Sequence, residues 1–207
     1  MAQAIDRRRF IAAAAAATGA LALPARLPAQ ALAIDGKSQR ILDVARREVE
    51  RAGAALWRRD IVGVADFGVH SSQARFHFAN LEAGTVSSHL VAHGLGSDPG
   101  HDGWLHWFSN EVGSNATSRG AYISYEWYKG KYGTSIRLGG LDAENSNALD
   151  RAIVLHAADY ATPAFLAAHG VLGRSNGCFA MDPADLPYAL TQLSGGRLLY
   201  ADRLGIV

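Results

Sequence analysis

Two stretches set the expected fold: I-V-L-H at Ile153 to His156 and G-R-S-N-G-C-F-A at Gly173 to Ala180. The first is a short, wholly apolar strand pattern that ends on a histidine. The second holds Cys178, the only cysteine of the 207 residues, among glycines and hydrogen-bond donors. A structural cysteine usually sits in an apolar run, where it packs as a small hydrophobe. The pattern therefore predicts a thiol presented for chemistry, with an inert cysteine as the alternative.

Acyl transfer by a thiol needs a nucleophile, a base, donors for the oxyanion and an open site. Cys178 would be the nucleophile. His156 is the best-placed base, because a strand end is a rigid mount and the 22 positions to Cys178 let the chain return beside the strand. Gly177 permits an unusual backbone angle, so amides near it can point at one oxygen. His169, at a predicted helix end, is the alternative base.

Three further features border this pair. Arg174 could hold a thiolate, bind a substrate carboxylate or only close the loop. His93 follows an apolar strand and precedes a glycine, so we expect it to face the site as a substrate contact. The segment from Gly94 to Gly120 is long and rich in Gly, Ser, Asn and His. Loops of that length in a compact domain are usually functional or mobile, so we expect it to form part of the site wall.

Periodicity elsewhere predicts a mainly β (α+β) domain with a helix at each end. An apolar stripe over 38–55 predicts an amphipathic helix. Asp182-Pro183 resembles a helix cap followed by proline at the first helical position, which predicts a helix towards Leu193. Alternating or apolar runs predict strands at 61–64, 75–80, 85–92, 121–128, 134–138, 153–155 and 197–200.

The first residues are typical of an export signal. D-R-R-R-F-I at 6–11 precedes a moderately apolar run, and Ala29-Gln30-Ala31 offers a small-x-small cleavage site. The paired arginines resemble a twin-arginine signal, and prolines interrupt the run too early for a membrane anchor. We therefore expect export to the periplasm or the outside. A lone thiol is costly to keep in such an oxidising compartment unless it is buried or used.

Composition and charge indicate a folded protein and argue against one class of partner. The chain is 49% hydrophobic and 19% charged, as in a folded globular protein. Its net charge is +1, but residues 1–31 supply four arginines and one aspartate, so the rest is weakly acidic. A weakly acidic body without a basic run argues against nucleic acid as a partner.

A zinc site is a weaker alternative. His89 and His93 are four apart, and His101, Asp102 and His106 follow closely. The first pair could share a metal on a helix, but the segment is predicted to be a strand, where such residues stand about 13 Å apart. No H-E-x-x-H occurs.

Four ordered segments then resemble one family. They are V-x-H-G at 91–94, F-S-N at 108–110, Y-x-G at 128–130 and G-R-S-x-G-C at 173–178. Together with His156 they resemble the L,D-transpeptidase catalytic domain (YkuD-like), closest to a murein-active branch, over about 61–202. The family signature is a histidine, a mid-teens spacer and Ser/Thr-His-Gly-Cys. Here the spacer is 18 residues, Asn176 replaces the second histidine, and F-A-M follows Cys178 without the arginine or asparagine often found there.

The resemblance implies a β-sandwich or barrel with flanking helices that acts on peptidoglycan stem peptides without a metal or organic cofactor. Cys178 would attack the carbonyl before a terminal D-amino acid, and the acyl-thioester would pass to an amine or to water. The predicted catalytic residues are Cys178, His156 and Gly177. The predicted substrate contacts are His93, Ser109, Asn110, Arg174, Ser175 and Asn176. A zinc-dependent wall peptidase and a non-catalytic wall-binding domain are the alternatives.

The predicted organisation is a signal peptide over 1–31, a helical segment over 32–60 and a catalytic domain over 61–207. After cleavage of the signal, no stable membrane anchor is expected. The sequence does not choose between transfer and hydrolysis, and it leaves the acceptor amine and the oligomeric state open.

Overall fold

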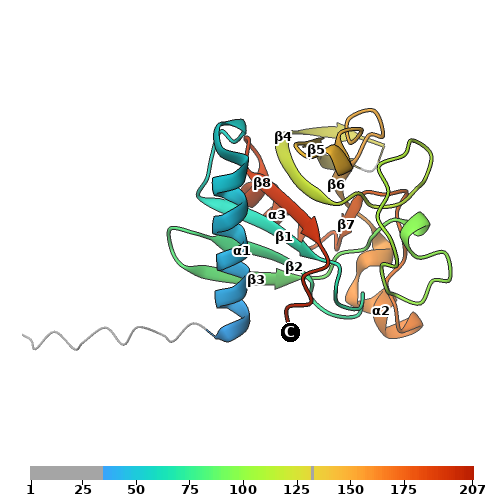
Figure 1. The fold of residues 1–207 in the computed structure, drawn as a ribbon. Coiled ribbons are helices and arrows are strands. Elements are labelled where there is room, and N and C mark those ends of the chain that lie inside the picture. The colour runs from blue at the N-terminus through green and yellow to red at the C-terminus, as the bar shows by residue number, and fades with distance from the viewer. Residues whose placement is uncertain (1–34, 132) are drawn as a thin grey trace, which may run out of the picture. The chain divides into compact units, whose positions relative to one another are not determined.

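The computed structural model describes residues 35–131 and 133–207, which form one compact unit around a single eight-stranded sheet (Figure 1). The strands are β1 (Ile61–Asp66), β2 (Phe76–Asn80), β3 (Thr85–His89), β4 (Gly120–Gly130), β5 (Gly133–Gly140), β6 (Val154–Ala157), β7 (Phe179–Met181) and β8 (Leu198–Asp202). The α-helices are α1 (Gly36–Ala52), α2 (Pro163–His169) and α3 (Leu186–Leu193). The predicted mainly β fold with flanking helices is confirmed.

The strands follow the order β3-β2-β1-β8-β4-β5-β6-β7, so the sheet is a half-barrel rather than two stacked sheets. The β1–β8 and β6–β7 pairs are parallel, and the other neighbours are antiparallel. In β4 the register shifts between Ser124 and Trp127, which is a β-bulge. Bulges bend a strand and increase its twist, which helps a sheet to curve.

The two faces of the sheet carry separate apolar clusters. Along β8, Leu198 and Tyr200 join the cluster that contains α1, whereas Leu199 and Ala201 join the cluster that contains α3. Successive side chains of a strand point to opposite faces, so α1 and α3 cover opposite faces of the sheet. Figure 1 shows α1, in blue, crossing the face of β1, β2 and β3.

Helix α1 is part of the same core as the sheet. Its buried Ile41, Leu42 and Ala45 pack with Val62 and Val64 of β1. The Asp35 side chain accepts a hydrogen bond of 2.9 Å from the Ser38 amide and so caps the first turn. The helix therefore begins earlier than its apolar stripe indicated. The predicted signal over 1–31 lies outside the described residues.

Near the site, strand β7 was not predicted, and α2 was indicated only by its end at His169. Strand β7 has only three residues, and α2 lies between β6 and β7, where Thr162 caps it and Pro163 begins it. Strand β6 also extends past His156 to Ala157, so this histidine lies inside the strand rather than at its end. Helix α3 begins later than expected, because Asp182 first forms a turn in which its carboxylate accepts a hydrogen bond from Ala184. Among the described helices, none has the length and apolar character needed to cross a bilayer.

Candidate active site

Cys178 and His156 lie on neighbouring parallel strands. Cys178 immediately precedes β7, and the β6–β7 register pairs His156 with Ala180. Residues two apart on a strand share a face, so the thiol and the imidazole project on the same side of the sheet. The structure therefore brings together the two residues that the sequence paired as nucleophile and base.

Both side chains open into one cleft of about 320 Å³. Its lining is formed by Arg151, Ala152, His156, Tyr160, Arg174, Ser175, Asn176 and Cys178. Five of these residues were expected in the site from the sequence. Arg151, Ala152 and Tyr160 were not.

The imidazole of His156 is 3% exposed, and its Nδ1 lies 2.8 Å from the carbonyl oxygen of Ala157. A carbonyl can only accept, so Nδ1 carries the proton and the neutral ring presents its lone pair at Nε2. Burial lowers the pKa of His156, and the bond to Ala157 opposes this shift. The ring is therefore neutral at pH 7, as a general base must be.

Cys178 is also held in its neutral form. Burial raises the pKa of its thiol, while the Val154 amide and the Arg151 charge lower it. The thiol lies 3.7 Å from the carbonyl oxygen of Ala152, towards which it donates. Ala152 has φ 52°, a left-handed conformation that is uncommon for a residue with a Cβ.

Ser175 holds the loop that carries the thiol. Its hydroxyl donates to the Cys178 carbonyl at 2.6 Å and accepts from the Gly177 amide at 3.1 Å. Its own amide donates to the His93 carbonyl at 2.9 Å. Ser175 is thus largely an organiser of the loop. The Gly177 amide is engaged inside the loop, contrary to the expectation that it would point at a substrate oxygen.

Gly177 is needed for its backbone conformation. Its φ is 110°, which L side chains rarely adopt, and a Cβ here would lie 2.8 Å from the Ala116 carbonyl oxygen. The loop therefore passes close beneath the segment around Ala116, and only glycine fits.

The position of His93 does not support its predicted role as a substrate contact. Its ring is 1% exposed and is not among the residues that line the cleft. The Arg75 guanidinium donates to its Nδ1 at 2.7 Å, so Nε2 carries the proton and faces the Asp98 carboxylate at 3.3 Å. Burial and the Arg75 charge lower the pKa of His93. A buried ring between two partners braces the fold.

Ser109 and Asn110 are not among the residues that line the cleft, so their predicted role as substrate contacts gains no support from it. They line a neighbouring pocket of about 270 Å³. The Ser109 carbonyl accepts a hydrogen bond of 2.7 Å from Arg151. The Asn110 amide donates at 3.0 Å to the Ala143 carbonyl. Both residues fasten the long segment 94–120. This segment packs against the loop that carries Cys178, but none of its residues is among those that line the cleft.

Arg174 and Asn176 do line the cleft. The Arg174 guanidinium donates to the Asp98 carbonyl, so it closes the loop against segment 94–120, one of the three roles considered for it. Asn176, which replaces the signature histidine, is exposed beside Cys178.

His169, the alternative base, lies outside the cleft lining, and its Nδ1 donates to the carbonyl of Phe165 at 2.8 Å.

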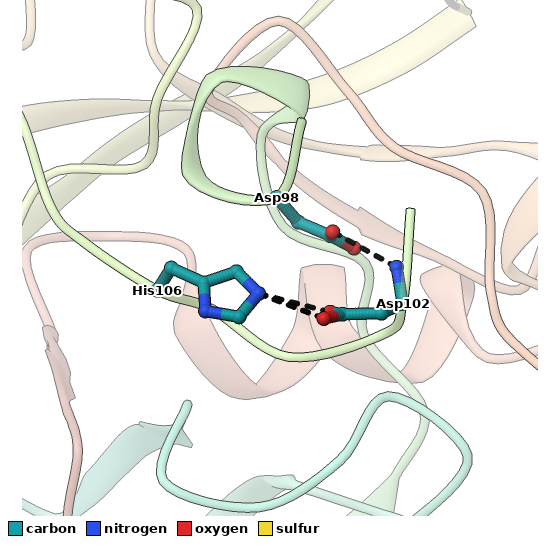
Figure 2. Close-up of side chains that lie close together, drawn as sticks. All are labelled: Asp98, Asp102 and His106. Carbon is teal, nitrogen blue, oxygen red and sulfur yellow. Dashed lines mark hydrogen bonds and ion pairs between the residues drawn. The ribbon is translucent and has the colours of Figure 1, made fainter. Parts of the chain in front are cut away.

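The histidines of the zinc alternative are not gathered around one point. His89 contacts Asp185 at 3.0 Å, His93 is held by Arg75, and His101 contacts the Leu172 carbonyl at 2.8 Å. Within residues 35–131 and 133–207, the only cluster of three possible metal ligands is Asp98, Asp102 and His106, drawn in Figure 2.

Hydrogen bonds inside the loop account for the arrangement of that cluster. Asp98 is buried and accepts from the amides of Asp102 and Gly103, each at 3.0 Å. Asp102 in turn accepts from His106 Nε2 at 2.9 Å (Figure 2). These contacts brace segment 94–120 against itself.

A thiol and a neutral imidazole that open into one cleft are the two groups that an enzyme of the cysteine-nucleophile class requires. The particular family follows from comparison. The chain belongs to the L,D-transpeptidase catalytic domain family, whose model matches residues 35–201. This match includes α1 as well as the sheet and confirms the resemblance read from the sequence.

Solved structures of low sequence identity are also similar. An L,D-transpeptidase from Mycobacterium smegmatis is 15% identical, with a TM-score of 0.43 over 69% of this chain and 58% of that one. An L,D-transpeptidase from Mycobacterium tuberculosis H37Rv is 16% identical, with a TM-score of 0.44 over 69% and 57%. The helical cell shape determining protein Pgp2 from Campylobacter jejuni is 13% identical, with a TM-score of 0.43 over 82% and 57%. The chain thus spans under two thirds of each. No curated protein sequence matches.

Proposed function

We propose that this protein is a cysteine-dependent acyltransferase that acts on peptidoglycan stem peptides, as an L,D-transpeptidase or an L,D-carboxypeptidase. The observation that carries the proposal is the shared cleft of Cys178 and neutral His156 in a chain of this family. Thiol acyl transfer needs these two groups beside an opening that admits a peptide.

In the proposed reaction, His156 Nε2 takes the proton of Cys178 as the sulfur attacks the carbonyl before the terminal D-amino acid. The tetrahedral intermediate collapses when His156 returns the proton to the leaving amine, and the D-amino acid departs. An acyl-thioester remains on Cys178. The amine of a second stem attacks it and gives a cross-link, or water attacks it and gives a trimmed stem.

Arg174 and Asn176 are the proposed substrate contacts, because both line the cleft beside the thiol. A substrate carboxylate would be attracted to the Arg174 guanidinium, and Asn176 offers both a donor and an acceptor to a peptide backbone. Ser175 and Gly177 support these contacts by fixing the loop. The proposal requires no cofactor.

We also propose that the protein works outside the cytoplasm, in the periplasm or beyond, after export through the twin-arginine route. The support is the arginine pair and weakly apolar run near the N-terminus, together with a substrate class that lies in the wall. Replacing Arg7 and Arg8 with lysines should retain the protein in the cytoplasm, as fractionation would show.

The activity is tested by incubating the purified protein with disaccharide-tetrapeptide and analysing the products by mass spectrometry. We expect a cross-linked dimer or a tripeptide product, each formed with loss of the terminal D-amino acid. Cys178→Ala should abolish both products, and His156→Gln should slow them by at least about a hundredfold. His169→Ala is the matched control and should react as the wild type does. Product formation by Cys178→Ala that a chelator stops would refute the proposal and favour a zinc peptidase.

A further inference from the structure

We propose that Arg151 is a positioning residue for the nucleophile: its guanidinium clamps segment 109–116 over the catalytic loop and sets a positive charge beside Cys178. The inference rests on the proposed function only in taking Cys178 as the nucleophile. Neither the family motifs nor the spacing of the catalytic pair pointed to this arginine.

The clamp is built from two hydrogen bonds to backbone. Arg151 Nη1 donates to the Ser109 carbonyl at 2.7 Å, and Nη2 donates to the Ala116 carbonyl. These carbonyls lie at the two ends of one turn of segment 94–120. The planar fork of an arginine can hold two such acceptors in a fixed geometry, which a lysine ammonium cannot.

The guanidinium is packed against the loop that carries the thiol. A Cβ placed on Gly177 would lie 3.0 Å from Arg151 Nη2, so the arginine touches the residue that precedes Cys178. Arg151 and Cys178 also line the same cleft. The glycine therefore makes room for the arginine as well as for the Ala116 carbonyl.

The charge of Arg151 remains available to the thiol. Both of its acceptors in the clamp are neutral carbonyls, which orient a guanidinium without neutralising it. Three other arginines, Arg51, Arg119 and Arg197, instead contact carboxylates within 3.0 Å, whereas Arg174 also donates to a backbone carbonyl. The positive charge of Arg151 lowers the pKa of the Cys178 thiol and so opposes the effect of burial.

The groups that attract the sulfur differ between its thiol and thiolate forms. As a thiol, it donates towards the Ala152 carbonyl at 3.7 Å. Once His156 removes the proton, a carbonyl oxygen no longer attracts the sulfur, whereas the Arg151 charge and the Val154 amide do. The segment from Arg151 to His156 would thus provide the charge, an amide donor and the base.

The test is the pH dependence of Cys178 alkylation by iodoacetamide, followed by intact mass. Wild type, Arg151→Gln and Arg151→Lys are compared, with Arg119→Gln as the matched control because Arg119 lies outside the cleft lining. We expect Arg151→Gln to raise the thiol pKa by about one unit, which is about a tenfold slower alkylation at neutral pH. Arg151→Lys should shift it by less than about half as much, because the charge is kept. Arg119→Gln should leave the thiol pKa as it is.

An unchanged thiol pKa in Arg151→Gln, or an equal shift in the glutamine and lysine variants, would overturn the inference. If Arg151→Gln does not fold, Arg151→Ala takes its place with the same expected shift, and Arg151→Lys remains the charge-retaining comparison. Alkylation needs no peptidoglycan. A wild type that alkylates as expected but turns over no stem peptide would refute the proposed function and leave this inference standing.

Discussion

Burial disfavours the charged forms of both Cys178 and His156. It raises the pKa of the thiol and lowers the pKa of the imidazole, so the resting site holds two neutral groups rather than a thiolate–imidazolium pair. Proton transfer then accompanies attack on the substrate. A neutral thiol is also less prone to oxidation than a thiolate, which would suit a lone cysteine in the oxidising compartment proposed for this protein.

The pH profile of stem-peptide turnover should reflect this arrangement. The base works only when His156 is neutral, and its lowered pKa means that protonation begins below the ordinary histidine value of about 6.5. We therefore expect the acid limb of kcat/KM to reach half its maximum below pH 6.5. A half-maximal rate above pH 7 on the acid limb would contradict a lowered pKa for His156.

Gly177→Ala should damage both the loop and the chemistry. The new Cβ would meet the Ala116 carbonyl oxygen at 2.8 Å at a φ of 110°. Strain of this kind costs about 1–3 kcal/mol, and a shifted Cys178 should lower turnover by more than about tenfold. Thermal unfolding and turnover measure the two effects. Gly100→Ala is the control, because nothing lies within 4 Å of a Cβ there. Equal behaviour of the two variants would count against the tight passage at Gly177.

At the scale of elements, a buried row of polar groups fixes segment 94–120. Arg75 is fully buried, donates to the carbonyls of Val69 and Val91, and reaches His93 at 2.7 Å. His93 links it to Asp98, whose backbone carbonyl receives Arg174 from the catalytic loop. The row thereby connects the loop after β1 with Arg174, which lines the cleft.

We expect His93→Ala to lower the free energy of unfolding by about 2–4 kcal/mol, because it leaves the buried Arg75 and Asp98 without their shared partner. The effect on the KM for a stem peptide should be small in protein that stays folded. Urea unfolding and steady-state kinetics separate the two. A large rise in KM without loss of stability would restore the substrate contact that the sequence suggested.

Periodicity was enough to predict most of the sheet, because strands such as β1, β2 and β8 alternate or form continuous apolar runs. It missed β7, which has three residues, and indicated only the end of the seven-residue α2 at His169. Elements this short carry too few positions for a period. β7 gains its pairing from β6 on one side and from Ala92 on the other, through contacts distant in sequence.

Some residues of the candidate site could likewise be predicted from the sequence, and others could not. Cys178 and His156 could be paired from residue type and spacing, but Arg151 could not, since its role comes from two backbone carbonyls far along the chain. The one signal available was a cation at the entry to an apolar strand. The sequence suggested a substrate contact at His93 because a histidine before a glycine resembles a site residue. Its buried partner, Arg75, lies on another strand connection and is distant in sequence.

At the scale of the whole molecule, α1 closes one face of the sheet over a buried histidine. His77 in β2 is fully buried, its Nδ1 lies 2.8 Å from the Ser88 hydroxyl, and its Nε2 makes no hydrogen bond. Burial lowers the pKa of His77 to about 4. Protonation of this ring beneath α1 therefore destabilises the folded state.

The sign of the pH effect follows from that shift. Between about pH 6.5 and 4 the unfolded chain binds a proton at His77 that the folded chain does not, so stability falls as the pH falls through this window. His77→Leu should flatten the dependence by up to about 2–3 kcal/mol in denaturant unfolding measured across the window. His169→Ala, which alters an exposed histidine, should retain the wild-type slope. An unchanged slope in His77→Leu would show that the ring is not held neutral.

The most direct test of the central claim is a search for the acyl-enzyme. The protein is mixed with disaccharide-tetrapeptide, quenched in acid and weighed intact, and the modified peptide is then located by fragmentation. We predict a mass gain equal to the substrate minus its terminal D-amino acid, placed on Cys178 and absent from Cys178→Ala. Turnover of the stem peptide with no adduct on Cys178, and with undiminished activity in Cys178→Ala, would contradict the account.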